Sequence, residues 1–330
     1  MIAITPQNLP ERLTIRMILQ EALSRNWQAF TYALNGSHAV LIRPDGKELS
    51  IYSSCPPATP YVGARISDDK YLTHLVLEDA GLPLLATYRC QTEAEATLAV
   101  QKIIDSGKGY VIKPLDASHG NGITVGMQTL EQLPVALAYA NRFSPTTIIQ
   151  AYQAQPIDLR VLCIDYKVAA VLERIPARVT GDGTHTIAEL ITLENKQRGT
   201  QYTSDLSTIP LDRAEAFFGG AINDVLASGE VIQVLGTANM GTGGEGHDVT
   251  DDVPAWLVTM AEQAAHALGL PVCGVDFLVT ASPRPTATVA ELQPSITEVN
   301  KCPSLFIHEQ PMHGAGHPVT AMYVDYLAKI

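Results

Sequence analysis

Residues 111–125 read VIKPLDASHGNGITV, an apolar run that carries a lysine and is followed by a glycine-rich turn. The β-branched run predicts a strand that holds Lys113 rigidly, and the glycines and asparagine of the turn tolerate a positive φ. Such a turn can point consecutive N–H groups at a phosphate, while the lysine adds a point charge. The residues alone equally allow a plain strand end with a tight turn. The common phosphate-binding loop, G-x-x-x-x-G-K-[ST], occurs nowhere in the chain.

The composition is that of a globular protein of enzyme size. The chain has 330 residues, which suits two or three lobes, and 46% of them are hydrophobic. Charged residues make up 17%, below the usual level of about 25%, so a large buried core is expected. The formal net charge of −12 argues against nucleic acid as a partner. An anionic ligand would have to be held by a few local cations and backbone amides.

The cysteines and the apolar segments indicate the compartment. The cysteines number five, an odd count, and no C-x-x-C pair occurs, so neither structural zinc nor a disulfide framework is predicted. The N-terminal residues lack the pattern of a signal peptide, and no run of about 18 apolar residues is present. These features predict a soluble cytoplasmic protein without a membrane partner.

Strands and helices are expected to alternate irregularly, which favours α+β lobes over a doubly wound sheet. Helical periodicity covers residues 12–25, and HAVLIRP and KELSIYS read as a hairpin turning at PDGK. The proline-rich residues 53–67 are predicted to be a connector, followed by a helix from Ser67 that stops at Gly81. Residues 158–177 read as two strands joined by a tight turn, and TATVAELQ (286–293) as a strand.

Three oxygen-bearing side chains near the C-terminus suggest a metal site. Asp276 interrupts the apolar strand VCGVDFLV, and Glu298 and Asn300 are two residues apart, on one face of a strand. Carboxylate and amide oxygens suit Mg²⁺ that bridges phosphates. Asp276 could instead be a hydrogen-bonded turn acid, and Glu298 an exposed strand residue. The three together, with Lys113 and its glycine-rich turn upstream, favour a site.

Further candidates have weaker signals. The stretch 150–161 could be a linker that offers backbone groups to adenine, with Asp158 accepting the ribose hydroxyls. Arg174 and Arg178 suit carboxylate or phosphate, or surface ion pairs. The loop NMGTGGEG (239–246) formally contains G-x-G-x-x-G, but no helix follows directly, so an anion-holding loop is the better interpretation. The sequence does not place a histidine beside a serine or a cysteine. Covalent catalysis, including attack by Cys302, is therefore not predicted.

Taken in order, these segments resemble the ATP-grasp superfamily of carboxylate–amine ligases over roughly residues 66–330. The resemblance is strongest to the ATP-grasp domains of cyanophycin synthetase and of the bifunctional glutathione synthetase. The segments that carry it are SDDKYLTHLVLEDAGLPLLATY, VIKPLDASHGNGITV, RIPARVTGDGTHTIAELI, NMGTGGEGHDVTDDV, VCGVDFL and TEVNKCPSLFIH.

The resemblance implies an α+β ATP-grasp fold in which two lobes clamp ATP. It divides the chain into an N-terminal lobe (1–66), a central lobe (67–149) and a C-terminal lobe (150–330) with a helical insertion at about 181–235. The implied ATP-binding residues are Lys70 and Lys113 on the phosphates, the mobile loop Ser118, His119, Gly120, Asn121 and Gly122, the hinge Gln150, Ala151 and Tyr152, and the ribose acid Asp158.

The remaining roles are implied in the same way. Asp276, Glu298 and Asn300 match the ligands of two Mg²⁺ ions, with Mn²⁺ as a possible substitute. Catalytic positions near the transferred phosphate are Arg174, Arg178 and Asn239. Substrate-binding positions are Arg160, Gly243, Gly244, Cys302 and Ser304.

Two departures from the family pattern stand out. Gln150 replaces a usual glutamate at the hinge, and no arginine precedes the Asn239 loop, so Arg174 or Arg178 would have to supply that charge. The modules that flank the ATP-grasp domain in both families are not found, which predicts a stand-alone ligase for one coupling. Its first 65 residues would replace part of the acceptor site.

The resemblance thus implies an ATP-dependent ligase that joins a carboxylate and an amine through an acyl phosphate, releasing ADP and phosphate. Amino acids or small peptides are the expected substrates, and a homodimer is expected. One alternative is a stand-alone enzyme that joins γ-glutamylcysteine to glycine. Another alternative, of a different class, is a non-catalytic ATP-binding regulatory module. The retained lysines and predicted metal ligands argue against it.

Overall fold

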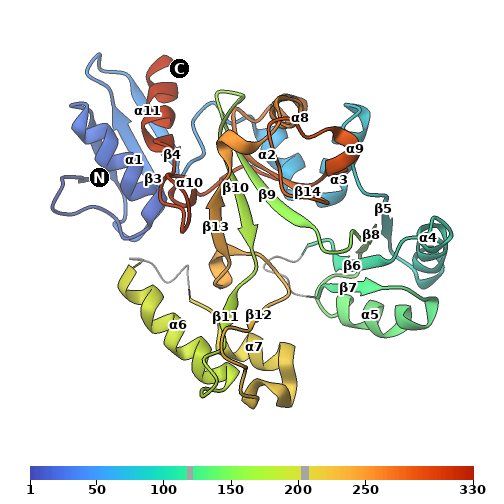
Figure 1. Ribbon diagram of the computed structural model, residues 1–330. Helices are drawn as coiled ribbons and strands as arrows, with labels where there is room; N and C mark the ends of the chain where they lie inside the picture. Colours follow the sequence, from blue (N-terminus) through green and yellow to red (C-terminus); the bar gives the residue numbers. More distant parts are fainter. Residues whose placement is uncertain (117–121, 202–207) are drawn as a thin grey trace.

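The computed structural model describes residues 1–116, 122–201 and 208–330. Within them the chain forms four antiparallel sheets, each covered by helices, and Figure 1 shows these as separate lobes around a central five-stranded sheet. The α+β prediction is confirmed. No helix in the described part of the chain is both long enough and apolar enough to span a membrane.

The N-terminal lobe is built from both ends of the chain. Its sheet has the order β1-β2-β3-β4, and the helices α1 and α11 pack side by side on it. Ile18 and Leu41 share one buried core with Tyr323 and Leu327 of α11, so the lobe is completed by the last helix of the chain. The predicted hairpin at PDGK is confirmed as β3–β4, with Gly46 at φ +85° in the turn. The bounds are β1 (Ile2–Ala3), α1 (Leu13–Ser24), β2 (Gln28–Thr31), β3 (His38–Ile42), β4 (Glu48–Tyr52) and α11 (Val319–Lys329).

One helix forms where a connector alone was predicted, and the predicted helix follows it. Residues 61–68 form α2 (Tyr61–Asp68), so the second half of that prediction is wrong. The reason is close packing: a Cβ on Gly63 would lie 2.1 Å from the carbonyl oxygen of Leu268, so only glycine lets α2 approach α8. The helix α3 (Lys70–Asp79) begins as predicted, because Asp69 accepts the N–H groups of its first turn. Both helices contact α8 and β15 of the large sheet.

The central lobe is a four-stranded sheet of order β5-β8-β6-β7 with α4 and α5 against it. The strand β6 alternates as its sequence predicts: Tyr110 and Ile112 are buried in the core, and Lys113 points to the opposite face. The bounds are β5 (Thr87–Cys90), α4 (Glu93–Asp105), β6 (Tyr110–Pro114), β7 (Thr124–Met127), η1 (Leu130–Gln132), α5 (Leu133–Ala140) and β8 (Thr147–Ala151).

The C-terminal lobe has the five-stranded sheet β13-β10-β9-β14-β15, with α8 packed on one face. The predicted turn between β9 and β10 is confirmed, with Asp165 and Tyr166 both at positive φ. The strand predicted at 286–293 is wrong. Thr288 and Glu291 form a capping box there that starts a short helix. The bounds are β9 (Ile157–Ile164), β10 (Lys167–Ile175), η4 (Met240–Thr242), β13 (Glu245–Asp248), η5 (Thr250–Asp252), α8 (Ala255–Leu268), β14 (Val272–Val279), α9 (Val289–Leu292), β15 (Ser295–Asn300) and α10 (Phe306–Glu309).

The insertion forms a small unit with its own core, in the lower part of Figure 1. Two helices pack on a two-stranded ribbon, one strand of which (178–180) precedes the predicted helical stretch while the other (231–233) lies near its end, so the insertion is helical but anchored by β structure. The bounds are β11 (Arg178–Thr180), α6 (Ile187–Gln201), α7 (Leu211–Phe218), η3 (Gly219–Asn223) and β12 (Val231–Gln233).

Candidate functional site

One face of the five-stranded sheet collects the predicted metal ligands. Asp276 on β14 lies directly opposite Glu298 on β15 and Arg160 on β9, and Asn300 follows two residues after Glu298. Directly opposed residues share a face of the sheet, and so do residues two apart on one strand. The register slips just beyond Asp276, where Thr297 is an extra residue in β15. The bulge sets the register that places Glu298 beside Asp276.

Asp276 is buried between two arginines. Its Oδ1 accepts a hydrogen bond from Nε of Arg160, and its Oδ2 accepts bonds of 3.0 Å from Nη2 of both Arg160 and Arg174. Burial raises the pKa of Asp276, but Arg160 and Arg174 outweigh it, and the pKa is lowered, so the carboxylate is charged. Gly274 makes the arrangement possible, since a Cβ there would lie 3.0 Å from Cδ of Arg160.

The donor set has the chemistry that suits a hard cation. The Nδ2 atom of Asn300 is buried and has no hydrogen-bond partner among the described residues. The amide oxygen and nitrogen are interchangeable by rotation, so the group can turn its oxygen to a ligand. With the carboxylates of Asp276 and Glu298 this makes three oxygen donors, which fit Mg²⁺. Among the described residues no group of three His, Cys, Asp or Glu could hold a metal ion, so the predicted set includes an amide.

Lys113, the lysine of the opening motif, lies in a cleft between the four-stranded sheet of the central lobe and β15 of the five-stranded sheet. The cleft is lined by Lys70 and His74 of α3, by Lys113 and Gln150 of the central sheet, and by Thr297 of β15, among others. Burial lowers the pKa of Lys113 to about 8; Glu298 opposes this shift and Lys70 adds to it. The two lysines are therefore brought together with the metal-ligand strand, as the resemblance implied.

Gln150 and its neighbours at the predicted hinge have protein partners. Oε1 of Gln150 accepts a 3.0 Å hydrogen bond from Nζ of Lys113, and its Nε2 donates a 2.8 Å bond to Oγ1 of Thr87. The N–H groups of Ala151 and Tyr152 donate to carbonyl oxygens of neighbouring loops. The role of these residues toward adenine stays a prediction, and in the structure the side chain of Gln150 holds the ammonium group of Lys113.

Asp158 also has a protein partner. It accepts hydrogen bonds of 2.9 and 2.7 Å from Nε and Nη2 of Arg174, so Arg174 bridges Asp158 and Asp276. Burial raises the pKa of Asp158 to about 6, although Arg174 opposes it. Its role toward ribose stays a prediction, and so does the role of Arg174 toward phosphate.

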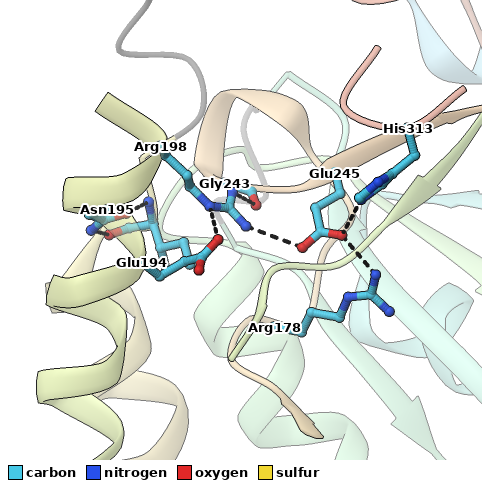
Figure 2. Close-up of polar contacts among 8 residues, drawn as sticks. Arg178, Glu194, Asn195, Arg198, Gly243, Glu245 and His313 are labelled. Carbon is cyan, nitrogen blue, oxygen red and sulfur yellow. Dashed lines mark hydrogen bonds and ion pairs between the residues drawn. The ribbon is translucent and has the colours of Figure 1, made fainter. Parts of the chain in front are cut away.

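A buried arginine organises the second glycine-rich loop. Arg198 of α6, whose side chain is 1% exposed, donates 2.6 Å to the carbonyl oxygen of Gly243 and 3.2 Å to Oε1 of Glu245. The other oxygen of Glu245 accepts 3.0 Å from Nη2 of Arg178, and Nε2 of His313 lies 3.3 Å away (Figure 2). Glu245 thus joins the insertion, the loop and Arg178 in one network.

The loop itself is tightly constrained. Asn239 accepts the N–H of Gly241 through its Oδ1, and Gly243 lies at φ +84°, where a Cβ would be 2.6 Å from Ile209. A Cβ on Gly244 would lie 2.7 Å from the carbonyl oxygen of Ala238. These glycines are explained by backbone geometry, and their role toward a substrate stays a prediction.

The remaining predicted residues lie after β15 and in the stretch 118–122. Cys302 and Ser304 follow β15 and line a cavity against the N-terminal lobe, where Oγ of Ser304 lies 3.4 Å from Oγ1 of Thr14. Gly122 lies at φ +73°, where a Cβ would meet Phe143 and Pro114, in agreement with the predicted turn. Ser118, His119, Gly120 and Asn121 lie outside the described residues.

Sequence reasoning missed three residues beside the site. Arg198 and Glu245 are common residue types in a helix and a loop, and only their burial distinguishes them. His308 is fully buried near Arg160, Arg174 and Asp276, and neither ring nitrogen has a partner within the described residues. Nothing in the sequence around this histidine indicates that it is buried beside these charges.

The fold has a solved counterpart. The bifunctional glutathione synthetase of Pasteurella multocida matches with a TM-score of 0.68 and 23% identity, over 96% of this chain and 43% of that one. That protein is of the glutathione synthetase type, whose ATP-grasp domain the sequence resembles. The chain shares the fold of that glutathione synthetase. No family model matches the chain.

The chain is also similar in sequence to curated synthetases. Cyanophycin synthetase of Geminocystis herdmanii is 35% identical over 280 residues, covering 82% of this chain and 31% of that protein. The cyanophycin synthetase of Crocosphaera subtropica is 33% identical, with 81% and 31% covered. The glutathione biosynthesis bifunctional protein GshAB of Enterococcus faecalis is 30% identical, with 79% and 35% covered. The chain thus spans about a third of the length of these relatives.

Proposed function

We propose that this chain is an ATP-dependent carboxylate–amine ligase of the ATP-grasp superfamily. The observation that carries the proposal is the alignment of Asp276, Glu298 and Asn300 on one sheet face, with Lys113 and Lys70 in the adjoining cleft. Carboxylates that hold cations, placed beside lysines that meet phosphates, are what phosphoryl transfer requires. The similar curated proteins carry the names cyanophycin synthetase and glutathione biosynthesis bifunctional protein GshAB, which supports a synthetase reaction for this chain.

The residues divide the work by charge. Asp276, Glu298 and Asn300 would hold Mg²⁺, in our proposal two ions, and Mn²⁺ would fit the same oxygen donors. When bound, the metal offsets the charge of the ATP phosphates. Lys113, positioned by Gln150, and Lys70 would hold phosphate oxygens from the other side of the cleft.

The substrate side is the opposite flank of the sheet. Arg174, Arg178 and Asn239 lie toward the glycine-rich loop, and we propose that an arginine there meets the carboxylate that becomes the acyl phosphate. Arg178 has 44% of its side chain exposed, so it is the arginine open to a substrate, while Glu245 fixes its direction. An amine would then displace phosphate and form the amide. Amino acids or small peptides are the proposed substrates.

The test is a substrate panel on the purified chain with ATP and Mg²⁺. Amino acids and dipeptides are combined as acid and amine, and ADP and phosphate are measured together with the amide by mass spectrometry. Release that requires both partners supports the proposal. Turnover confined to γ-glutamylcysteine and glycine would select the glutathione-type reaction. ATP binding without turnover for any pair would instead indicate a regulatory module. Light scattering of the same sample tests the proposed homodimer.

A further inference from the structure

The cysteines at positions 55 and 302 meet at the seam between the N-terminal lobe and the loop after β15. Their Sγ atoms are 2.7 Å apart, although 247 residues separate them in the chain. A disulfide bond is about 2.04 Å long, so a small displacement would bond them. We propose that Cys55 and Cys302 form a reversible disulfide in exchange with small-molecule disulfides.

Backbone contacts hold the two thiols in register. Sγ of Cys55 lies 3.2 Å from the carbonyl oxygen of Lys301, and Sγ of Cys302 lies 3.3 Å from that of Tyr52. Beside the two cysteines, Oγ of Ser54, which precedes Cys55, donates 2.5 Å to the carbonyl oxygen of Pro303, which follows Cys302. The two segments are therefore already fixed side by side, and the bond would form without a rearrangement of either lobe.

The position of Cys302 suits thiol–disulfide exchange. Both thiols are partly exposed, and Cys302 lines a cavity of about 440 Å³ that a small disulfide can enter. An accessible thiol beside a second thiol is the usual attacking group once it has lost its proton.

A second pair in the chain serves as an internal comparison. Cys163 and Cys273 lie directly opposite each other on β9 and β14. Both are fully buried in the core of the large sheet, so a reagent cannot reach them. The hydrogen bond with Cys273 and the burial of the thiol raise the pKa of Cys163, which makes Cys163 a poor nucleophile. Both pairs thus bring two thiols close together. Of the two pairs, only Cys55 and Cys302 can be reached by a reagent from solvent.

The exchange balances as two steps. The Cys302 thiolate attacks one sulfur of the small disulfide, forms a mixed disulfide and releases one thiolate. Cys55 then loses its proton to solvent and attacks the sulfur of Cys302, releasing the second thiolate. Overall the two protein thiols lose two protons and two electrons, and the small disulfide gains them as two thiols. This assignment does not depend on the proposed ligase reaction.

The experiment uses the whole chain with bis(2-hydroxyethyl) disulfide, followed by acid quenching, alkylation of remaining thiols and peptide mass mapping. A linked pair of peptides containing Cys55 and Cys302, two hydrogens lighter and reversed by dithiothreitol, supports the proposal. In Cys55→Ser the mixed disulfide should instead accumulate on Cys302, and Cys90→Ala should behave as the unaltered chain.

Three results would overturn it. These are persistence of both thiols, a mixed disulfide on Cys302 of the unaltered chain that Cys55 does not displace, and a link that joins another pair. The circular dichroism of each variant before oxidation shows whether it is folded. The unaltered chain gives the decisive mapping on its own, so a variant that fails to fold does not remove the test.

Discussion

Asp276 and Glu298 face each other across β14 and β15, one strand from Arg160. The pairing places a carboxylate that is already neutralised by two arginines next to one that is not bonded to them. Glu298 is therefore the ligand on which cation binding should depend most directly, and the first prediction addresses it.

Glu298→Gln should reduce metal-dependent ATP consumption at least about 100-fold, because an amide replaces a charged ligand. The melting temperature should stay within about 2 °C, since Glu298 lies at the edge of a cleft and leaves no cavity. Mn²⁺ binding followed by electron paramagnetic resonance measures the ligand loss independently of turnover. Glu48→Gln, at an exposed position of β4, is the control. Unchanged Mn²⁺ affinity in Glu298→Gln would contradict the site.

Nucleotide binding should weaken as the pH rises through about 8. Burial lowers the pKa of Lys113 to about 8, so the free protein loses this charge above that pH, and ATP binding must restore it by taking up a proton. Calorimetry at pH 8.5 in two buffers of different ionisation enthalpy measures the uptake.

Gln150→Glu provides the matched variant for this effect. It would put a carboxylate at the atom that lies 3.0 Å from Nζ of Lys113, and so raise the lysine's pKa. The fall in affinity should then move to higher pH. An affinity that is constant from pH 7 to 9.5 in the unaltered protein would show that Lys113 does not meet the nucleotide.

His308 should make the fold sensitive to acid. Burial lowers its pKa to about 3, helped by Arg160 and Arg174, whereas an unfolded histidine titrates near 6.5. Between these values the unfolded chain binds more protons than the folded one, so the free energy of unfolding falls as the pH falls, by about 1.4 kcal/mol per pH unit. The part of this effect due to His308 should disappear in His308→Phe.

Urea unfolding at pH 7 and pH 5 measures the difference. Lowering the pH should cost the unaltered protein about 2 kcal/mol more than His308→Phe. The control is His185→Gln, at an exposed histidine whose pKa is raised by Asp182, so its removal should not lessen the acid sensitivity. Equal losses in His308→Phe and the unaltered protein would refute the assignment.

Arg198 should stabilise the insertion. Arg198→Met leaves Oε1 of Glu245 and the carbonyl oxygen of Gly243 buried without their donor, which typically costs about 1–3 kcal/mol, because Arg178 still pairs with Oε2 of Glu245. Lys196→Met changes an exposed lysine of the same helix and should be nearly neutral. Hydrogen exchange should locate the loss in α6 and the glycine-rich loop. Uniform exchange in both variants would contradict the role of Arg198.

The sequence predicted those parts of the fold whose signals are local. The alternation around Lys113, the cap at Asp69 and the turn at Asp165 each depend on neighbouring residues, and each appears as expected. The strand predicted at 286–293 failed because TATVAELQ is as apolar as a strand. The capping pair Thr288 and Glu291 decides for a helix.

Long-range contacts could not be predicted in this way. Arg198 has the sequence surroundings of an exposed helical residue, and only the fold brings Glu245 and Gly243 to it. Gln150 was recognised as a departure from the family, but its bond to Lys113 requires the pairing of β6 with β8. Likewise, no sequence pattern relates Cys55 to Cys302.

The shared core of α1 and α11 has a consequence for how the protein is made. Leu41 and Ile18 emerge from the ribosome early, but their packing partners Tyr323 and Leu327 are about three hundred residues behind them. The face of this lobe that α11 covers is therefore an open hydrophobic surface until translation reaches α11. We expect this lobe to be the last to become resistant to protease, and nascent chains that stop before residue 319 to need a chaperone there.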